Sequence, residues 1–364
     1  MQQEVHEKTV ESGTIEAGAQ ETGWTDRSPL AMFGIFLRGL AMGAADIVPG
    51  VSGGTMAFIF GIYEELINSI KTIGQREFID AALHLRLREA ISMINWSFLV
   101  PLGLGVMAAI FSLAGALEYF LTHQPVYLWS FFFGLIIASV IVIGGRIKQW
   151  NLGIIGAVIL GAVGTYWLVS LVPAQTPDTW WFYMLTGALA SAAMILPGIS
   201  GAYILVMLGK YQSVLGAVNQ RDFLTLALIA AGAAIGLVTF AQILSWLFKR
   251  YHDYTVAVLI GLLLGSLRKV WPWKVDVNWL VDENGRFVLE HGERIVIKQI
   301  NVLPDLSTTT GVLEVLTALT LAALGMGAVL LIERIASRGE DILSLIHISE
   351  PTRRRDSSRM PSSA

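Results

Sequence analysis

The sequence contains no cysteine, and charged residues are scarce along its 364 positions. Without cysteine, neither a disulfide framework nor a thiolate metal site can form. Charged residues make up 15% of the chain and the mean hydropathy is +0.62, whereas soluble domains carry about 25% charged residues. The net charge of -3 gives no reason to expect a nucleic-acid partner. This balance predicts a membrane protein.

The residue patterns of common enzymes and metal sites are also missing. The six histidines fall in expected tails or loops, and no two of them have metal-ligand spacing. The Pro-Gly-x-Ser-Gly segments described below are not G-x-S-x-G nucleophile elbows, and they lack the lysine of a phosphate-binding P-loop. We therefore expect no enzyme, no catalytic residue, no metal and no cofactor. A membrane phosphatase is disfavoured because no nucleophile–base pair is visible.

What the sequence does have is a glycine-rich break in an apolar region, and this break occurs twice. Residues 46–55 read Asp-Ile-Val-Pro-Gly-Val-Ser-Gly-Gly-Thr, and residues 194–203 read Met-Ile-Leu-Pro-Gly-Ile-Ser-Gly-Ala-Tyr. The offset of 148 residues persists downstream, where 61–63 and 209–211 both begin with glycine and end with tyrosine. The chain is therefore interpreted as a duplication.

Each break divides an apolar stretch into two short arms. In the first copy the arms are Leu30–Ala45 and Thr55–Ile70, and neither reaches the ~20 residues that cross a bilayer. In the second copy Trp180–Leu208 surrounds the break, and its second arm continues to about Val218. Two short arms around a Pro-Gly turn indicate a re-entrant helical hairpin whose turn is buried in protein or lines a wet cavity.

Three spans are expected after each hairpin. They are Ser97–Leu117, Val126–Gly145 and Leu152–Val172 in the first copy, and Phe223–Leu247, Thr255–Leu267 and Gly311–Ile332 in the second. The middle spans match, because residues 133–139 resemble residues 260–266. Three crossings are an odd number, so the second half enters the membrane from the opposite side. The expected fold is an all-α polytopic membrane protein with an inverted-topology repeat, as in many secondary transporters.

The expected organisation is a polar, disordered tail over 1–28, a first repeat over 29–172, a second repeat over 173–335, and a disordered or non-native tail over 336–364. The first tail does not resemble a cleaved signal peptide. Residues 270–310 form an extracytoplasmic insert, in which Asn284-Gly285 between Val-rich runs predicts a β-hairpin. Residues 71–95 are expected to form an interfacial amphipathic helix with loops.

Lysine and arginine favour a cytoplasmic N-terminus. With that orientation the cytoplasmic segments hold Lys71, Arg76, Arg86, Arg88, Arg146, Lys148, Lys249, Arg250, Arg334 and Arg338. The expected outer loops at 118–125 and 173–179 hold none, which fits the positive-inside rule. Four cations run against the pattern: Lys210, Arg221, Arg268 and Lys269.

The chemistry expected at a break is anion binding. The helix that starts after the break presents free backbone N–H groups and the positive end of its dipole, and phosphate suits such a site. Glycines 50, 53 and 54 let a ligand approach the backbone, and Ser52 and Thr55 add hydroxyl groups. Arg38 adds a charge that is costly in a membrane arm.

Alternatives stay open for these residues. A Pro-Gly break on its own is often only a kink, and Arg38 could extend its charged end to the membrane interface. Asp46 could cap a helix, pair with Arg38 or carry a proton. Its counterpart in the second copy is Met194, and the motif departs again at Ala202 and Tyr203, so we expect two non-equivalent half-sites.

The chain resembles the PopT-type polyprenyl-phosphate transporter family in four segments: 43–55, 61–64, 131–136 and 196–201. The resemblance covers about residues 30–335. It implies that the chain returns undecaprenyl phosphate from the outer to the inner leaflet of the bacterial cytoplasmic membrane, recycling the lipid carrier for envelope polymers. A transporter or channel for a soluble anion is the alternative.

The family's motif residues carry over as expected head-group contacts at Pro49, Gly50, Ser52, Gly53, Gly54, Thr55, Pro197, Gly198, Ser200 and Gly201. We add Arg38 on physical grounds and Asp46 as a neighbour of the break. The partners expected are therefore a polyprenyl phosphate and the membrane, with proton or sodium coupling and homo-oligomer formation left open.

Overall fold

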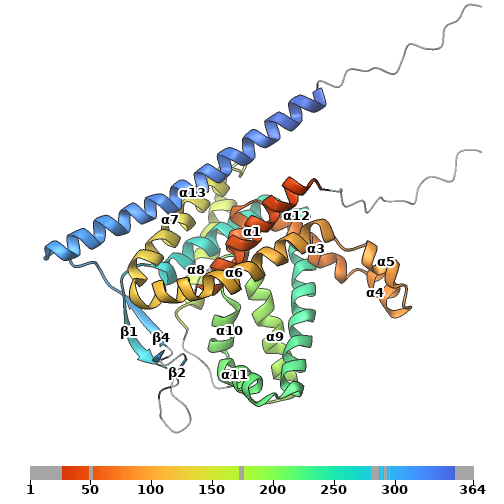
Figure 1. Ribbon diagram of the computed structural model, residues 1–364, viewed down its shortest axis with the longest axis horizontal. Coiled ribbons are helices and arrows are strands. Elements are labelled where there is room, and N and C mark those ends of the chain that lie inside the picture. Colours follow the sequence, from red (N-terminus) through yellow and green to blue (C-terminus); the bar gives the residue numbers. More distant parts are fainter. Residues whose placement is uncertain are drawn as a thin grey trace, which may run out of the picture.

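The computed structural model describes residues 27–48, 52–171, 176–279, 287, 289–290, 293–294 and 296–348. Residues 1–26 of the expected first tail, residues 349–364 of the expected second tail, the Asn284-Gly285 turn, and Pro49 and Gly50 of the first break lie outside these residues. The remainder of the second tail, 336–348, differs from the expected disorder, because the helix that begins at Thr309 continues to Ile348. The described part is mostly helical with a small antiparallel pair of strands (Figure 1). This confirms the expected class of fold at that level.

The helices of the first half are α1 (Pro29–Ile47), α2 (Gly53–Ile59), α3 (Tyr63–Ile73), α4 (Arg76–Leu83), α5 (Leu87–Ser92), α6 (Trp96–His123), α7 (Pro125–Gly144) and α8 (Leu152–Leu168). Those of the second half are α9 (Trp180–Ile195), α10 (Gly201–Met207), α11 (Tyr211–Gln220), α12 (Phe223–Val270) and α13 (Thr309–Ile348). The strands are β1 (Lys274–Trp279), β2 (Leu289–Glu290), β3 (Glu293–Arg294) and β4 (Val296–Asn301).

Five helices in the described part are long and apolar enough to cross a membrane: α1, α6, α7, α12 and the segment Thr309–Leu331 of α13. A sixth span results if the bent pair α10–α11 is counted as one. The helices α8 and α9 are apolar but shorter. At 48 residues, α12 is more than twice as long as one crossing requires, and it covers both spans expected between 223 and 267. A multi-pass membrane protein is therefore confirmed.

The second arm of each hairpin differs from expectation. We expected one apolar arm after each break, and each arm consists of two helices: α2 stops at Ile59 and α3 starts at Tyr63, while α10 and α11 are separated in the same way and bend by 108°. Gly61 (φ 69°) and Gly209 (φ 64°) occupy the left-handed region at the two bends. Glycine adopts that conformation without the steric cost that a Cβ would bring.

The first half also differs at its expected outer loop. The segment 118–125 was expected to be a loop, but α6 continues to His123, and Gln124 alone separates it from α7. The helix stops there because Pro125 disfavours the helical conformation in the residue before it. The third span is shorter than expected, since α8 ends at Leu168.

The two copies share their break points as well as their motifs. Adding 148 to the bounds of α2 gives those of α10, and the start of α3 maps onto the start of α11 in the same way. Adding 127 to Gln124 (φ −138°, ψ 50°) gives Tyr251 (φ −137°, ψ 49°), the residue at which α12 kinks. The second kink has the same backbone shape without a following proline.

The helices pack through glycines at matched places. A Cβ at Gly39 of α1 would lie 2.1 Å from the Leu102 carbonyl oxygen of α6, and one at Gly187 of α9 would lie 2.1 Å from the Ile229 oxygen of α12. Such close backbone contacts are the usual role of small residues in membrane helices.

The last helix of each half packs on the other half. A Cβ at Gly134 of α7 would lie 1.9 Å from the Ala322 oxygen of α13, and one at Gly261 in the second part of α12 would lie 2.3 Å from the Val158 oxygen of α8. Figure 1 shows α13 running along α7, and α9 beside the first part of α12 with α10 on the other side of α9. The two halves are therefore interleaved.

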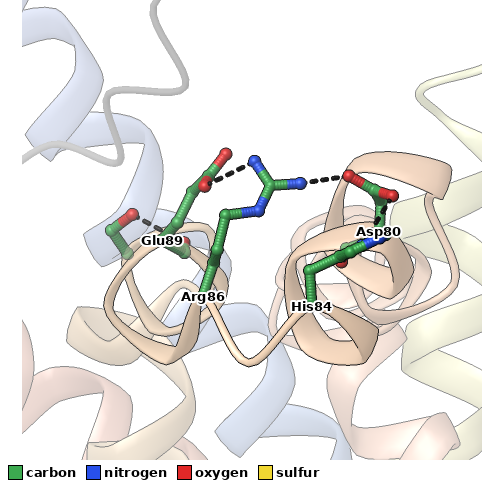
Figure 2. Close-up of polar contacts among 5 residues, drawn as sticks. Asp80, His84, Arg86 and Glu89 are labelled. Atoms are coloured by element: carbon green, nitrogen blue, oxygen red, sulfur yellow. Dashed lines mark hydrogen bonds and ion pairs between the residues drawn. The ribbon is translucent and has the colours of Figure 1, made fainter.

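Helices α4 and α5 form the amphipathic segment expected at 71–95. Leu83 and Leu85 are largely exposed between them. Figure 2 shows that Arg86 joins the two helices, since its guanidinium donates to Asp80 and, at 3.0 Å, to Glu89. Exposed apolar side chains beside charged groups suit a membrane interface.

The insert after α12 contains an antiparallel pair, as expected. Strand β1 pairs with β4, with Val275 opposite Ile300, and β2 pairs with β3. The Trp273 indole Nε1 donates to Glu314 of α13 at 2.9 Å, which ties the sheet to the end of the bundle where α13 begins.

Candidate functional site

The two breaks, 148 residues apart in sequence, are in direct contact. The Ser52 hydroxyl donates to the Met194 carbonyl oxygen at 3.1 Å, and the Gly198 N–H donates to the Thr55 hydroxyl oxygen at 2.9 Å. Both hydroxyl-bearing residues are buried, with exposed fractions of 1% for Ser52 and 0% for Thr55. Buried side-chain hydrogen bonds of this kind hold two segments in a defined relative position.

The helix start after the first break is occupied by the protein's own groups. The Gly53 N–H donates to the Asp46 carboxylate at 2.6 Å, and the Gly54 N–H donates to the Ser52 hydroxyl oxygen at 3.1 Å. Asp46 therefore acts as a helix cap, one of the three roles considered for it, and its carboxylate fills the position where we expected a bound anion.

The second break has a different environment. Met194, the counterpart of Asp46, is half-exposed, and Ser200 makes no side-chain cap with α10. Pro197 and Gly198 are buried, and Gly198 (φ 87°) lies against α12, where a Cβ would come within 2.9 Å of the Ser266 side chain. The two half-sites are thus not equivalent.

Arg38 lies elsewhere on α1. It precedes Asp46 by eight residues on α1, which is about 12 Å of helix rise, and its charged neighbours are Arg27 and Glu65. Glu65 also binds Arg27 and accepts from Asn95 Nδ2 at 2.8 Å. The structure therefore places Arg38 with the charged groups near the start of α3 and away from the contact between the breaks.

Sequence reasoning missed two lysines, one in the last turn of α12 and one at the start of β1. Lys269 had been noted only as a cation against the positive-inside pattern, and Lys274 had not been singled out. The Lys274 ammonium donates to the Lys269 carbonyl oxygen at 2.7 Å and lies 3.6 Å from the centroid of the Trp129 ring. By contrast, Lys210, which also ran against the pattern, is buried and forms an ion pair with Asp178.

The comparison with known proteins decides the family. A family model described as VCA0040-like, undecaprenyl phosphate translocase-like, matches residues 42–288. The chain belongs to this family. The matched segment contains both breaks, Ser266, Lys269 and Lys274.

Two relatives of this translocase-like family support the assignment. The polyprenyl-phosphate transporter of Vibrio cholerae serotype O1 is 40% identical over 305 residues, which cover 83% of this chain and 96% of that protein. The polyprenyl-phosphate transporter of Staphylococcus aureus is 31% identical over 257 residues, covering 65% of this chain and 85% of that protein. No solved structure matches the chain.

Of the two motif serines, Ser52 caps a helix with its side chain and Ser200 does not, and this difference gives a first prediction. Ser52→Ala removes a helix cap and a bond between the breaks, so we expect a loss of about 1–2 kcal/mol of unfolding free energy. Ser200→Ala removes no such cap, and we expect no measurable change. Thermal unfolding of the two purified single variants in detergent measures the difference. Equal destabilisation by both substitutions would contradict the described hydrogen bonds.

Proposed function

We propose that this chain moves undecaprenyl phosphate from the outer to the inner leaflet of the bacterial cytoplasmic membrane. The observation that carries the proposal is the family match over 42–288, together with a transporter relative that is 40% identical over 96% of its length. The multi-pass helical fold supports it. The assignment to a transporter family also agrees with the lack of enzyme motifs.

The proposed architecture is an inverted repeat in which each half has one re-entrant hairpin and three crossings, with the N-terminus in the cytoplasm. Three observations support it: the matched bounds of α2 and α10, the matched backbone angles at Gln124 and Tyr251, and the glycine contacts repeated in both halves. An odd number of crossings per half makes the two halves antiparallel across the membrane.

The proposed head-group site lies between the two breaks. It comprises the motif residues Pro49, Gly50, Ser52, Gly53, Gly54, Thr55, Pro197, Gly198, Ser200 and Gly201, with Asp46 beside them. The hydrogen bonds that join the breaks support this, because they occupy donors that a phosphate could take over. Binding then requires the breaks to separate, with the phosphate displacing the Asp46 carboxylate from the Gly53 N–H. Arg38 would meet the head group on its way to the cytoplasmic side.

Coupling to an ion gradient would act through Asp46. A protonated carboxyl group accepts from the Gly53 N–H less strongly than a carboxylate does, so proton uptake would help the phosphate to displace Asp46 from that N–H. Asp46→Asn keeps an oxygen acceptor but loses the charge. We therefore expect this variant to fold normally and to transport polyprenyl phosphate at a rate indifferent to an imposed proton gradient. A gradient response equal to that of the unchanged protein would remove Asp46 from this role.

The test of the function is transport in proteoliposomes. We expect protein-dependent loss of a polyprenyl phosphate from one leaflet, and no such movement of the corresponding polyprenol. Inorganic phosphate is the discriminating competitor, because a carrier for soluble anions would be inhibited by it and would leave the lipid in place. No lipid movement by folded protein under proton and sodium gradients would overturn the proposal.

A further inference from the structure

The proposed mechanism does not use two lysines, Lys269 in the last turn of α12 and Lys274 at the start of β1. We call them the lysine pair. The two residues are in contact, since the Lys274 ammonium donates to the Lys269 backbone oxygen. Each ammonium faces an aromatic ring: Lys274 lies 3.6 Å from the Trp129 centroid, and Lys269 lies 5.7 Å from the Tyr203 centroid. The lysine pair therefore joins α7, α10, α12 and β1.

No carboxylate neutralises the lysine pair within the described part of the chain, where neither ammonium forms an ion pair. The carboxylate whose charge acts on Lys274 is that of Asp276, which also accepts a hydrogen bond from the Gln299 amide at 2.8 Å. The Glu314 carboxylate accepts a hydrogen bond from the Trp273 indole. Burial, and then the charge of Lys269, lower the pKa of Lys274 to about 7. Two like charges that are partly withdrawn from water, with no carboxylate in direct contact, are unfavourable, so a functional reason is needed.

The lysine pair lies beside the second break. Ser266, one helical turn before Lys269, is the residue that Gly198 approaches on α12. Tyr203, whose ring faces the Lys269 ammonium, belongs to α10, the helix that starts after that break. Lys269 therefore lies one helical turn along α12 from the residue that contacts the buried Pro-Gly turn.

The lysine pair also breaks the match between the two halves. Subtracting 127 from Lys269 gives Val142 of α7, a half-buried apolar residue. The cations therefore stand at one end of the bundle only, the end that carries the β1–β4 sheet. In the proposed orientation this is the extracytoplasmic end, where lysine is disfavoured by the positive-inside rule.

We propose that Lys269 and Lys274 form the docking site where a phosphate monoester first binds at the extracytoplasmic face before it reaches the breaks. The inference rests on the proposed function and adds to it an entry point with named residues. The surrounding aromatic side chains of Trp129, Trp271 and Trp273 suit the membrane interface, so the ligand's apolar chain can remain in lipid while its phosphate contacts both ammonium groups.

Equilibrium binding to the purified full chain tests the assignment. The probes are a short-chain polyprenyl monophosphate, the corresponding polyprenol and inorganic phosphate, and binding is followed by quenching of tryptophan fluorescence. We expect Lys269→Met/Lys274→Met to weaken binding of the lipid phosphate by about tenfold or more, and Lys148→Met, which removes an exposed lysine at the opposite end, to have no effect. Inorganic phosphate binding as tightly as the lipid would overturn the assignment to a lipid head group.

A charge-preserving variant makes the test independent of any folding defect in the methionine pair. Lys274→Arg stays charged at all relevant pH values, whereas Lys274, whose charged neighbours are Lys269 and Asp276, loses its proton above about pH 7. We therefore expect equal affinity at about pH 6 and tighter binding by the arginine variant, by about tenfold, at about pH 8.5. The ionisation of the phosphate affects both proteins equally and cancels in this ratio.

The outcomes separate this inference from the proposed function. If the unchanged protein binds and transports the lipid while the methionine pair binds it equally well, the docking site is wrong and the function stands. An arginine variant with the same pH profile as the unchanged protein also overturns the docking site. If the unchanged, folded protein neither binds nor moves the lipid, the function fails and the docking site fails with it.

Discussion

Gly54→Ala is expected to reduce transport by more than about tenfold, although it adds only one methyl group, because each transport cycle must return to the arrangement in which the two breaks are joined. A Cβ at Gly54 would lie 2.3 Å from the Ile195 carbonyl oxygen and 3.0 Å from that of Met194. The start of α2 would have to move away from the end of α9, which would break the Ser52–Met194 and Thr55–Gly198 hydrogen bonds. Two such bonds at about 1 kcal/mol each correspond to more than tenfold in the population of the joined arrangement.

The duplication supplies a matched control for this substitution. The counterpart of Gly54 is Ala202, which is exposed on α10, so a side chain at that position meets no backbone. Ala202→Ser should therefore leave transport and thermal stability unchanged. Transport in proteoliposomes and thermal unfolding would be measured for both variants. A Gly54→Ala protein with normal transport would show that contact between the breaks is dispensable.

Gly105→Ala is expected to give the largest loss of stability among single methyl additions in α6. The Cβ would lie 2.1 Å from the Phe36 carbonyl oxygen and 2.7 Å from the Leu40 nitrogen of α1, and backbone atoms cannot rotate away as a side chain can. Forcing extra volume into a packed contact costs about 1–3 kcal/mol or more. Since α1 leads into the first break, we also expect reduced transport. Thermal unfolding in detergent measures the stability effect.

Gly103→Ala, two residues earlier on the same helix, is the control. No atom lies within 4 Å of a Cβ at that position. Alanine also favours a helix over glycine by up to about 1 kcal/mol, so this variant should be as stable as the unchanged protein or slightly more so. Similar unfolding temperatures for the two variants would contradict the close α1–α6 contact.

The sequence predicted the main features of the fold because they depend on periodic or repeated signals. The apolar runs located the spans, and the offset of 148 residues located both breaks. An antiparallel pair in the insert was expected, and β1 pairs with β4, but β2 and β3 lie between these strands and the Asn284-Gly285 turn lies outside the described residues. The hydrogen bonds of Ser52 and Thr55 show in addition that the two breaks are in contact.

Other features could not be predicted, because they depend on which surfaces meet. Hydropathy does not distinguish a continuous arm from α2 and α3, since Gly61 interrupts the helix through its backbone angle and the residues around it remain apolar. The cap by Asp46 stayed one alternative of three because the sequence cannot show where its carboxylate points. Lys274 was overlooked because its neighbours Trp129 and Lys269 come from other elements.

The exchange of packing partners between the halves has a consequence for biosynthesis. Helix α8 rests on the second part of α12, and α7 rests on α13, so neither partner exists when the first half leaves the ribosome. About a hundred residues separate α8 from its partner, which at typical translation rates is on the order of ten seconds. During that interval the insertion machinery must hold α7 and α8 in the membrane with their glycine faces uncovered. A truncated first half should accordingly be degraded, and co-expression of the second half should rescue it.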